Sequence, residues 1–173
     1  SIRILVEGYL FSLNRWYIND KVPLSFEKYL IFCSAEIELD KKNCKMNKLI
    51  IDATNEKILF MIINNDINYS ITHENTKINY EKLTLLILEF LTSKSLNLDK
   101  IAKIYVNRGP GSFAGIRNSL SIVKAIHLVN KIDYYCFSFR DFNEKNDVKY
   151  ENIPSLCDKF KVKKNLINPI YLS

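Results

Sequence analysis

The chain has 173 residues, of which 47% are hydrophobic and 25% are charged, so it can bury a core and is not a disordered polymer. The formal net charge of +6 permits contact with an anion such as RNA but does not require it, because the lysines are spread along the sequence. No apolar run approaches the roughly 18 residues of a membrane span, and the N-terminus lacks the order of a signal peptide, which predicts a cytoplasmic protein without membrane contact.

Cysteine and histidine spacing predicts no metal site. The four cysteines contain no C-x-x-C pair, and the two histidines are too few and too scattered to complete a zinc site with them. We therefore expect reduced cysteines and no bound metal or cofactor.

Short runs of apolar and β-branched residues after Met46 predict a sheet. Residues 48–53, 57–65 and 67–73 are separated by turns too short to hold a helix, which predicts three consecutive antiparallel strands. Residues 79–94 contain neither Gly nor Pro and are too long for a strand, so they predict a helix.

The second half of this region alternates strands with helices. Residues 103–107 predict a buried strand, and Ser112 can cap a helix that extends to about Val129. The apolar face of that helix recurs every three or four residues and consists of Phe113, Ile116, Leu120, Val123 and Ile126. With a last strand at 133–139, the order predicts an α/β fold: a mixed sheet of three antiparallel strands plus two strands that alternate with helices.

The stretch RGPGSFAG, residues 108–115, holds three of the four glycines in the chain. A P-loop would place Lys and Ser or Thr after the last glycine, but Ile116 and Arg117 stand there, which excludes that reading. The glycine spacing also has one residue too many for a dinucleotide-binding turn, and three antiparallel strands precede it. A catalytic loop of another kind and a turn that packs a helix tightly on a strand both remain open.

Residues 104–126 resemble the signature of the bacterial TsaB proteins, also called YeaZ, in which a strand is followed by G-R-G-P-G-S-F-T-G-[VL]-R and a helix. The positions in register are Arg108, Gly109, Pro110, Gly111, Ser112, Phe113, Gly115 and Arg117. Upstream, residues 49–63 resemble the family's I-D-T-S-T-E, with Asp52 and Glu56 kept, and NPIYLS near the end resembles the family's P-x-Y-L-R. Asn107 and Ala114 depart from the family's usual Gly and Thr.

This resemblance implies one lobe of the actin, Hsp70 and sugar-kinase superfamily, which is a ribonuclease H-like fold. It also implies a non-catalytic scaffold subunit that pairs with the catalytic subunit TsaD and, with TsaE, supports transfer of a threonylcarbamoyl group to the adenosine beside the anticodon of certain tRNAs. The tRNA would be reached only through the complex. The alternative is a small kinase-like enzyme of the same superfamily that uses Asp52 near a phosphate.

The two helices of the lobe are the expected partner surface, because pairing in this family runs through them. Apolar residues in 81–91 spread beyond one core-facing stripe, which predicts that something covers a second face. The expected contact residues, for a TsaD homologue or for a second copy when the chain is alone, are Leu83, Leu86, Phe90, Ile116, Leu120 and Val123.

The expected organisation has three parts. Residues 46–142 form the TsaB-like lobe, and residues 143–173 form a reduced remnant of a second lobe, in which 151–165 is a single helical element. Residues 1–45 match nothing in the family and precede Met46. They are either upstream or fused sequence, or an extension that packs on the lobe through its aromatic residues.

Overall fold

The computed structural model describes residues 3–6, 9–12, 47–64, 67–142 and 148–171. The chain divides into two units, residues 1–42 and residues 43–173. In the first unit, strands β1 (Arg3–Val6) and β2 (Tyr9–Ser12) pair antiparallel. Residues 13–46 lie outside the described part, so both readings of 1–45 stay predictions.

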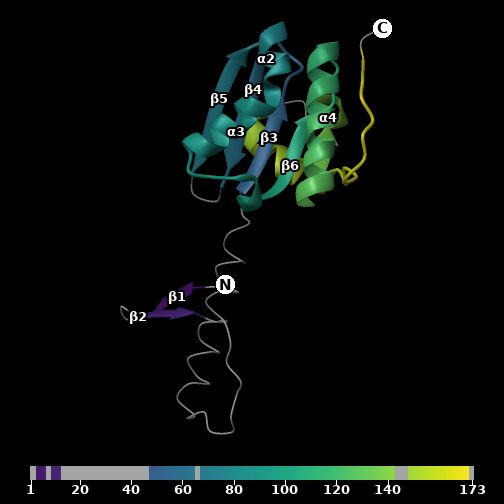
Figure 1. Ribbon diagram of the computed structural model, residues 1–173. Helices are drawn as coiled ribbons and strands as arrows, with labels where there is room; N and C mark the ends of the chain where they lie inside the picture. Colours follow the sequence, from purple (N-terminus) through teal and green to yellow (C-terminus); the bar gives the residue numbers. More distant parts are fainter. Residues whose placement is uncertain (1–2, 7–8, 13–46, 65–66, 143–147, 172–173) are drawn as a thin grey trace. The chain divides into compact units, whose positions relative to one another are not determined.

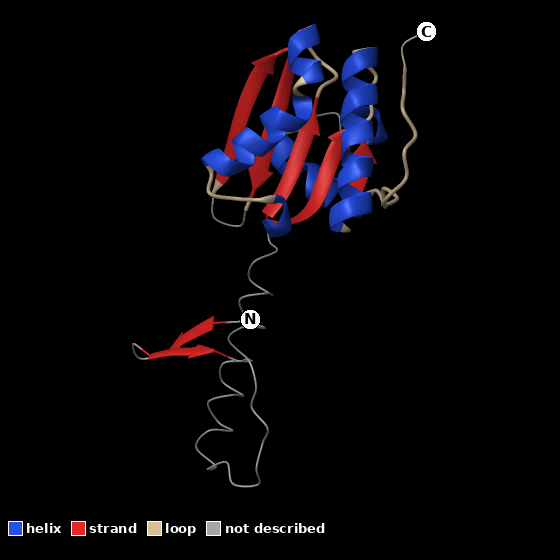
Figure 2. Ribbon diagram, in the orientation of Figure 1, coloured by secondary structure: helices blue, strands red, loops and turns tan. Residues whose placement is uncertain are grey.

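The second unit is built on a five-stranded mixed sheet in the order β5-β4-β3-β6-β7 (Figures 1 and 2). The strands are β3 (Asn47–Asp52), β4 (Lys57–Ile63), β5 (Asn68–Glu74), β6 (Ile101–Asn107) and β7 (Asp133–Phe137). β3, β4 and β5 pair antiparallel, whereas β6 lies parallel to β3 and to β7. The predicted mixed sheet of three antiparallel strands plus two is confirmed.

Three helices cover one face of this sheet, as Figure 1 shows. They are α2 (Lys77–Glu81), α3 (Leu83–Ser93) and α4 (Phe113–Asn130), and a 3-10 turn, η1 (Leu98–Lys100), leads from α3 into β6. The core on this side combines Leu49, Ile51 and Val106 of the sheet with the inner residues of α3 and α4. β3 is buried on both faces at its centre, where Leu49, Ile50 and Ile51 are consecutive apolar residues.

A smaller layer covers the opposite face. Two 3-10 turns, η2 (Phe139–Asp141) and η3 (Tyr150–Asn152), and the short helix α5 (Ile153–Lys159) belong to this layer. Its core joins Ile50, Tyr105 and Phe137 of the sheet to Ile153 and Leu156 of α5. No helix in the described ranges is both long enough and apolar enough to cross a bilayer.

Two predicted helices differ from those observed. The single helix predicted over 79–94 is two helices that meet at Lys82, where Tyr80 bonds Ser112 and Leu83 turns into the core. The element predicted over 151–165 is helical only to Lys159, because Lys161 takes a left-handed conformation (φ 53°) and ends the helix. The chain then extends to a bridge between Lys164 and Tyr135.

Candidate functional site: the glycine loop, the buried Asp52 and the helical face

The glycine loop is a joint between β6 and α4. The Ser112 side chain accepts a hydrogen bond from the Gly115 amide (3.3 Å), so it caps α4 as predicted. A Cβ atom at Gly111 would lie within 3.0 Å of Thr54, and one at Gly115 would lie within 3.0 Å of the Ala53 carbonyl group. The glycines therefore allow the start of α4 to pack against the turn between β3 and β4.

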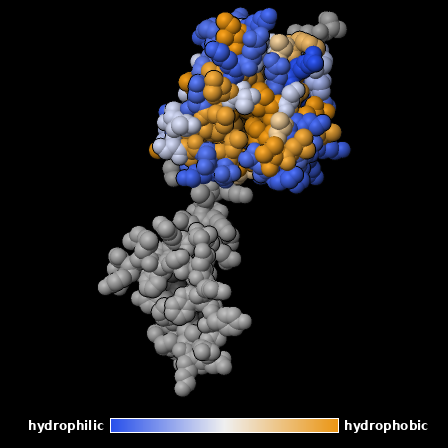
Figure 3. All heavy atoms as spheres, viewed as in Figure 1, coloured by the Kyte–Doolittle hydropathy of each residue, from blue (hydrophilic) through white to orange (hydrophobic). Residues whose placement is uncertain are grey.

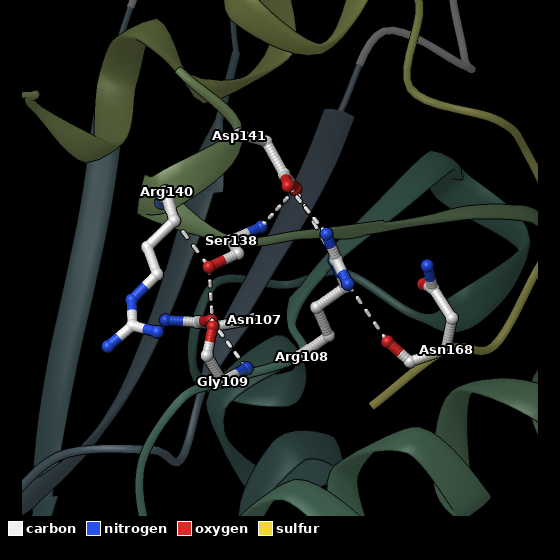
Figure 4. A network of polar contacts seen from close by, with 7 residues as sticks. All are labelled: Asn107, Arg108, Gly109, Ser138, Arg140, Asp141 and Asn168. Carbon is white, nitrogen blue, oxygen red and sulfur yellow. Dashed lines mark hydrogen bonds and ion pairs between the residues drawn. The ribbon is translucent and has the colours of Figure 1, made fainter. Parts of the chain in front are cut away.

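Arg108 is held by groups of the second unit (Figure 4). Its guanidinium donates to both carboxylate oxygens of Asp141, at 2.5 and 3.3 Å, and to the Asn168 carbonyl oxygen at 3.0 Å. The Ser138 hydroxyl donates to the Gly109 carbonyl oxygen at 2.6 Å, and the Ser138 amide donates to Asp141 at 2.8 Å. These contacts make Arg108 a clamp that fixes the loop to the end of β7 and to the C-terminal segment.

The C-terminal segment lies against the same loop and, as Figure 1 shows, runs beside α4. The Ile170 amide donates to the Arg108 carbonyl oxygen at 2.8 Å, and the rings of Phe113 and Tyr171 are 4.9 Å apart. Gly109 has a left-handed backbone (φ 103°), and the space beside it is filled by the Ile170 carbonyl oxygen. The NPIYLS motif is thus brought to the glycine loop, about 60 residues away in sequence, as the Arg108–Asn168 separation of 60 shows.

Asp52, at the end of β3, is fully buried. One carboxylate oxygen accepts hydrogen bonds from the Thr54 amide (2.9 Å) and hydroxyl (2.7 Å). The other accepts from the Asn107 side-chain amide and from the Tyr150 hydroxyl, both at 2.8 Å. A buried carboxylate needs such hydrogen-bond donors. These four donors occupy the lone pairs with which Asp52 would otherwise coordinate a metal ion, alone or together with a bound phosphate.

Tyr150 closes this site from the opposite layer of the fold. Burial, and after it the neighbouring Asp52, raises the pKa of the Tyr150 hydroxyl well above its ordinary value, so it stays a donor at neutral pH. An open hollow of about 770 Å³ lies next to it, lined by Thr54, Asn55, Glu56, Lys57, Leu59, Thr72, Asn75, Ser112 and Tyr150. Within the described ranges, no group of three or more His, Cys, Asp or Glu side chains could hold a metal ion.

Sequence reasoning found Asp52 but missed its partners. In the sequence, Asn107 stood out only because the family usually has glycine there. Its side-chain oxygen also accepts a hydrogen bond from the Gly109 amide at 3.0 Å. Tyr150 carries no motif and lies 98 residues from Asp52 in sequence. Of the remaining loop residues, Gly115 is buried, Pro110 is half-buried, and Phe113 and Arg117 are exposed.

The residues predicted to contact a partner are mostly core residues, which corrects that assignment. Leu86 is half-buried, whereas the other five are buried: Leu83, Phe90, Ile116, Leu120 and Val123. Their side chains face the sheet because β3 and β6 present apolar residues there. As predicted, α3 carries more apolar residues than a single core-facing stripe contains. The ones that face outward are Leu85 (50% exposed) and Leu88 (42% exposed).

Figure 3 shows that hydrophobic residues gather across the helical face of the second unit. The exposed large apolar residues on the helices of this face are Ile78, Leu85, Leu88, Phe113, Leu128 and Val129. We call these six residues the helical apolar surface. Monomeric proteins expose single apolar side chains routinely, whereas a group of them on one face is typical of a site for another macromolecule.

The comparisons with known proteins support the fold. No protein-family model matches the chain, and no curated protein matches it significantly. YeaZ from Pseudomonas aeruginosa is similar in structure, with a TM-score of 0.50 and 18% identity over 53% of this chain. A second structure, of an uncharacterized protein with similarity to peptidase YeaZ from the same organism, matches with the same values.

The match covers 43% of each of these structures, so the chain spans less than half of their length. The resemblance to YeaZ that the motifs indicated is confirmed for the fold. Identity of this level carries no residue roles from one protein to the other.

Proposed function

We propose that the chain is a non-catalytic scaffold subunit that binds a TsaD homologue and supports threonylcarbamoyl transfer to tRNA in the cytoplasm, together with a TsaE homologue. The motif of residues 108–117 and the YeaZ-like fold support this family assignment. The sequence identity to that YeaZ structure is 18%, so the fold supports the assignment through structure and the motif supports it through sequence.

The observation that carries the proposal is the helical apolar surface. Since the inner residues of α3 and α4 are already buried against the sheet, the exposed Leu85 and Leu88 add nothing to the core. Covering such side chains removes apolar area from water, which stabilises an association by roughly 25 cal/mol per Å² before its entropic costs. In the proposal this surface receives the TsaD homologue, or a second copy of the chain when no partner is present.

Co-purification tests this assignment. The full chain with Leu85→Asp and Leu88→Asp should fail to co-purify with the TsaD homologue from the native cell, because an unpaired charge buried in an interface costs on the order of 3–5 kcal/mol. Both positions are exposed, so the free energy of unfolding should change by no more than about 0.5 kcal/mol per substitution. Aspartate at Phe90 would instead place a charge in the core and would test folding, since Phe90 is buried.

Ile67→Asp is the matched control, because Ile67 is 55% exposed and lies between β4 and β5, away from the helices. It should leave co-purification intact. Retained binding by the double variant, or equal loss in the control, would mean that the helical apolar surface is not the binding surface.

A further inference from the structure

Lysines from three separate segments meet on the face of the sheet that carries α5. Lys48 of β3 and Lys103 of β6 are paired in register, and alternation places both on the face of Ile50 and Tyr105, which α5 covers. Lys164 reaches the same face at the edge of β7, where it bridges to Tyr135 and lies 3.2 Å from the Asp133 carboxylate. Asp133 pairs with Lys103 in register across β6 and β7, so these residues form one row across the sheet.

Two more lysines, Lys161 and Lys163, precede Lys164 in the chain. The segment from Asp158 to Asn165 holds four lysines and one acidic residue. Lys161 and Lys163 are exposed, while Val162 between them packs on the α5 core. We call Lys48, Lys103, Lys161, Lys163 and Lys164 the lysine patch.

Two features of the patch are unfavourable for the folded chain, and one of them, a left-handed lysine after a helix, also occurs at Lys131 outside the patch. Like charges directly opposite each other on neighbouring strands are destabilising, and this is the arrangement of Lys48 and Lys103. Lys161 has φ 53°, a left-handed conformation that favours glycine, at the position after a helix where glycine is the usual residue. Within the described ranges, Asp133 is the acid that pairs with a lysine of the patch.

The chemistry of the patch indicates a hydrophilic polyanion. Among residues 158–166 the exposed large apolar side chain is Leu166 (46% exposed), whereas Phe160 and Val162 pack on the α5 core, so this segment offers little that would insert into a membrane or fill an apolar interface. Lysine binds phosphate as a point charge and reads no base edges, so contacts of this kind depend on salt and not on nucleotide sequence.

We propose that the lysine patch binds the phosphate backbone of RNA, which gives the chain an RNA contact of its own in addition to the one expected through the complex. The choice of RNA over another polyanion rests on the proposed function. Lys48 and Lys103 lie on the opposite face of the sheet from α3 and α4, so RNA on that face and a protein partner on the helices could be bound together.

Binding of fluorescently labelled bulk tRNA to the full chain, followed by anisotropy over a salt series, tests the proposal. Lys161→Gly with Lys163→Gln should lower affinity by about fivefold per lysine at 0.1 M salt and reduce the log–log salt slope by about one per lysine. Lys124→Gln, which removes one exposed lysine from α4 on the other face, is the control for the loss of one positive charge and should have a much smaller effect than the loss expected per lysine of the patch.

The single variant Lys161→Gly distinguishes a loss of folding from a loss of binding, because its stability and its tRNA affinity should change in different ways. Glycine relieves the left-handed backbone at this position, so the melting temperature of the single variant should stay the same or rise while tRNA affinity falls. Unchanged affinity and slope in the double variant would overturn the proposal. An equal loss of tRNA affinity per lysine in Lys124→Gln would overturn it too, as would tighter binding to phosphatidylserine vesicles than to tRNA. Co-purification with the TsaD homologue is a separate measurement, which these lysine variants should leave intact.

Discussion

The packing of α4 on the turn between β3 and β4 predicts that Gly115→Ala destabilises the fold. In an exposed helix, alanine is more favourable than glycine by about 1 kcal/mol. At Gly115 the new Cβ would overlap the Ala53 carbonyl oxygen and approach Tyr80 Cε1 to 3.0 Å. The overlapped atom belongs to the backbone at the end of β3 and cannot rotate away, so the crowding should cost about 1–3 kcal/mol.

Crowding should exceed the gain in helix propensity and leave a net loss of up to about 2 kcal/mol. The measurement is urea unfolding of the full chain, followed by circular dichroism. Ala114→Gly is the matched control, because Ala114 is the exposed neighbour in the same helical turn and reports propensity alone, with an expected loss of up to about 1 kcal/mol. A Gly115→Ala protein as stable as wild type, or more stable, would refute the close approach.

Two further predictions concern buried titratable groups. Tyr150→Phe removes a donor from the buried Asp52 and should lower the free energy of unfolding by about 1.5–3 kcal/mol at pH 7 in a urea titration. Because the folded state raises the pKa of Tyr150 above the unfolded value, wild-type stability should be fully present below about pH 10 and decline above it, and this decline should be shallower in Tyr150→Phe. Burial raises the pKa of the Cys136 and Cys157 thiols to about 12, so iodoacetamide at pH 8 should label both in urea but neither in the folded chain, as peptide mass spectrometry would show.

The sheet was predictable because its signals are local. Each strand of the second unit is a short run with β-branched or aromatic residues, and Ser112 precedes an apolar helical repeat. The order of the elements along the chain and the helix cap therefore follow from neighbouring residues alone. The inner and outer faces of α3 were not predictable, since Leu85, Leu86 and Leu88 leave no polar stripe that would set the phase of the helix.

Long-range polar contacts were beyond sequence reasoning for a different reason. The partners of Asp52 come from β6 and from η3, and nothing in the spacing of Asn107 or Tyr150 indicates that they meet. The lysine patch is similar, because Lys48 and Lys103 become neighbours only through the parallel pairing of β3 with β6. Such sites require the topology before their residues can be grouped.

The glycine loop and the helical apolar surface belong to one arrangement, because the loop fixes where α4 begins. Its amides are used inside the lobe: Gly109 donates to Asn107, Ser112 donates to Thr54 and Gly115 donates to Ser112. A phosphate-binding loop would point such amides at a ligand. Here the amides bond groups of the protein, and one of these bonds ties the loop to the turn between β3 and β4. The contacts of the glycine loop at the first turn of α4 therefore set the position of the outer residues of this helix. If α4 contributes to the partner surface, a substitution that loosens this joint should weaken partner binding without touching the surface itself.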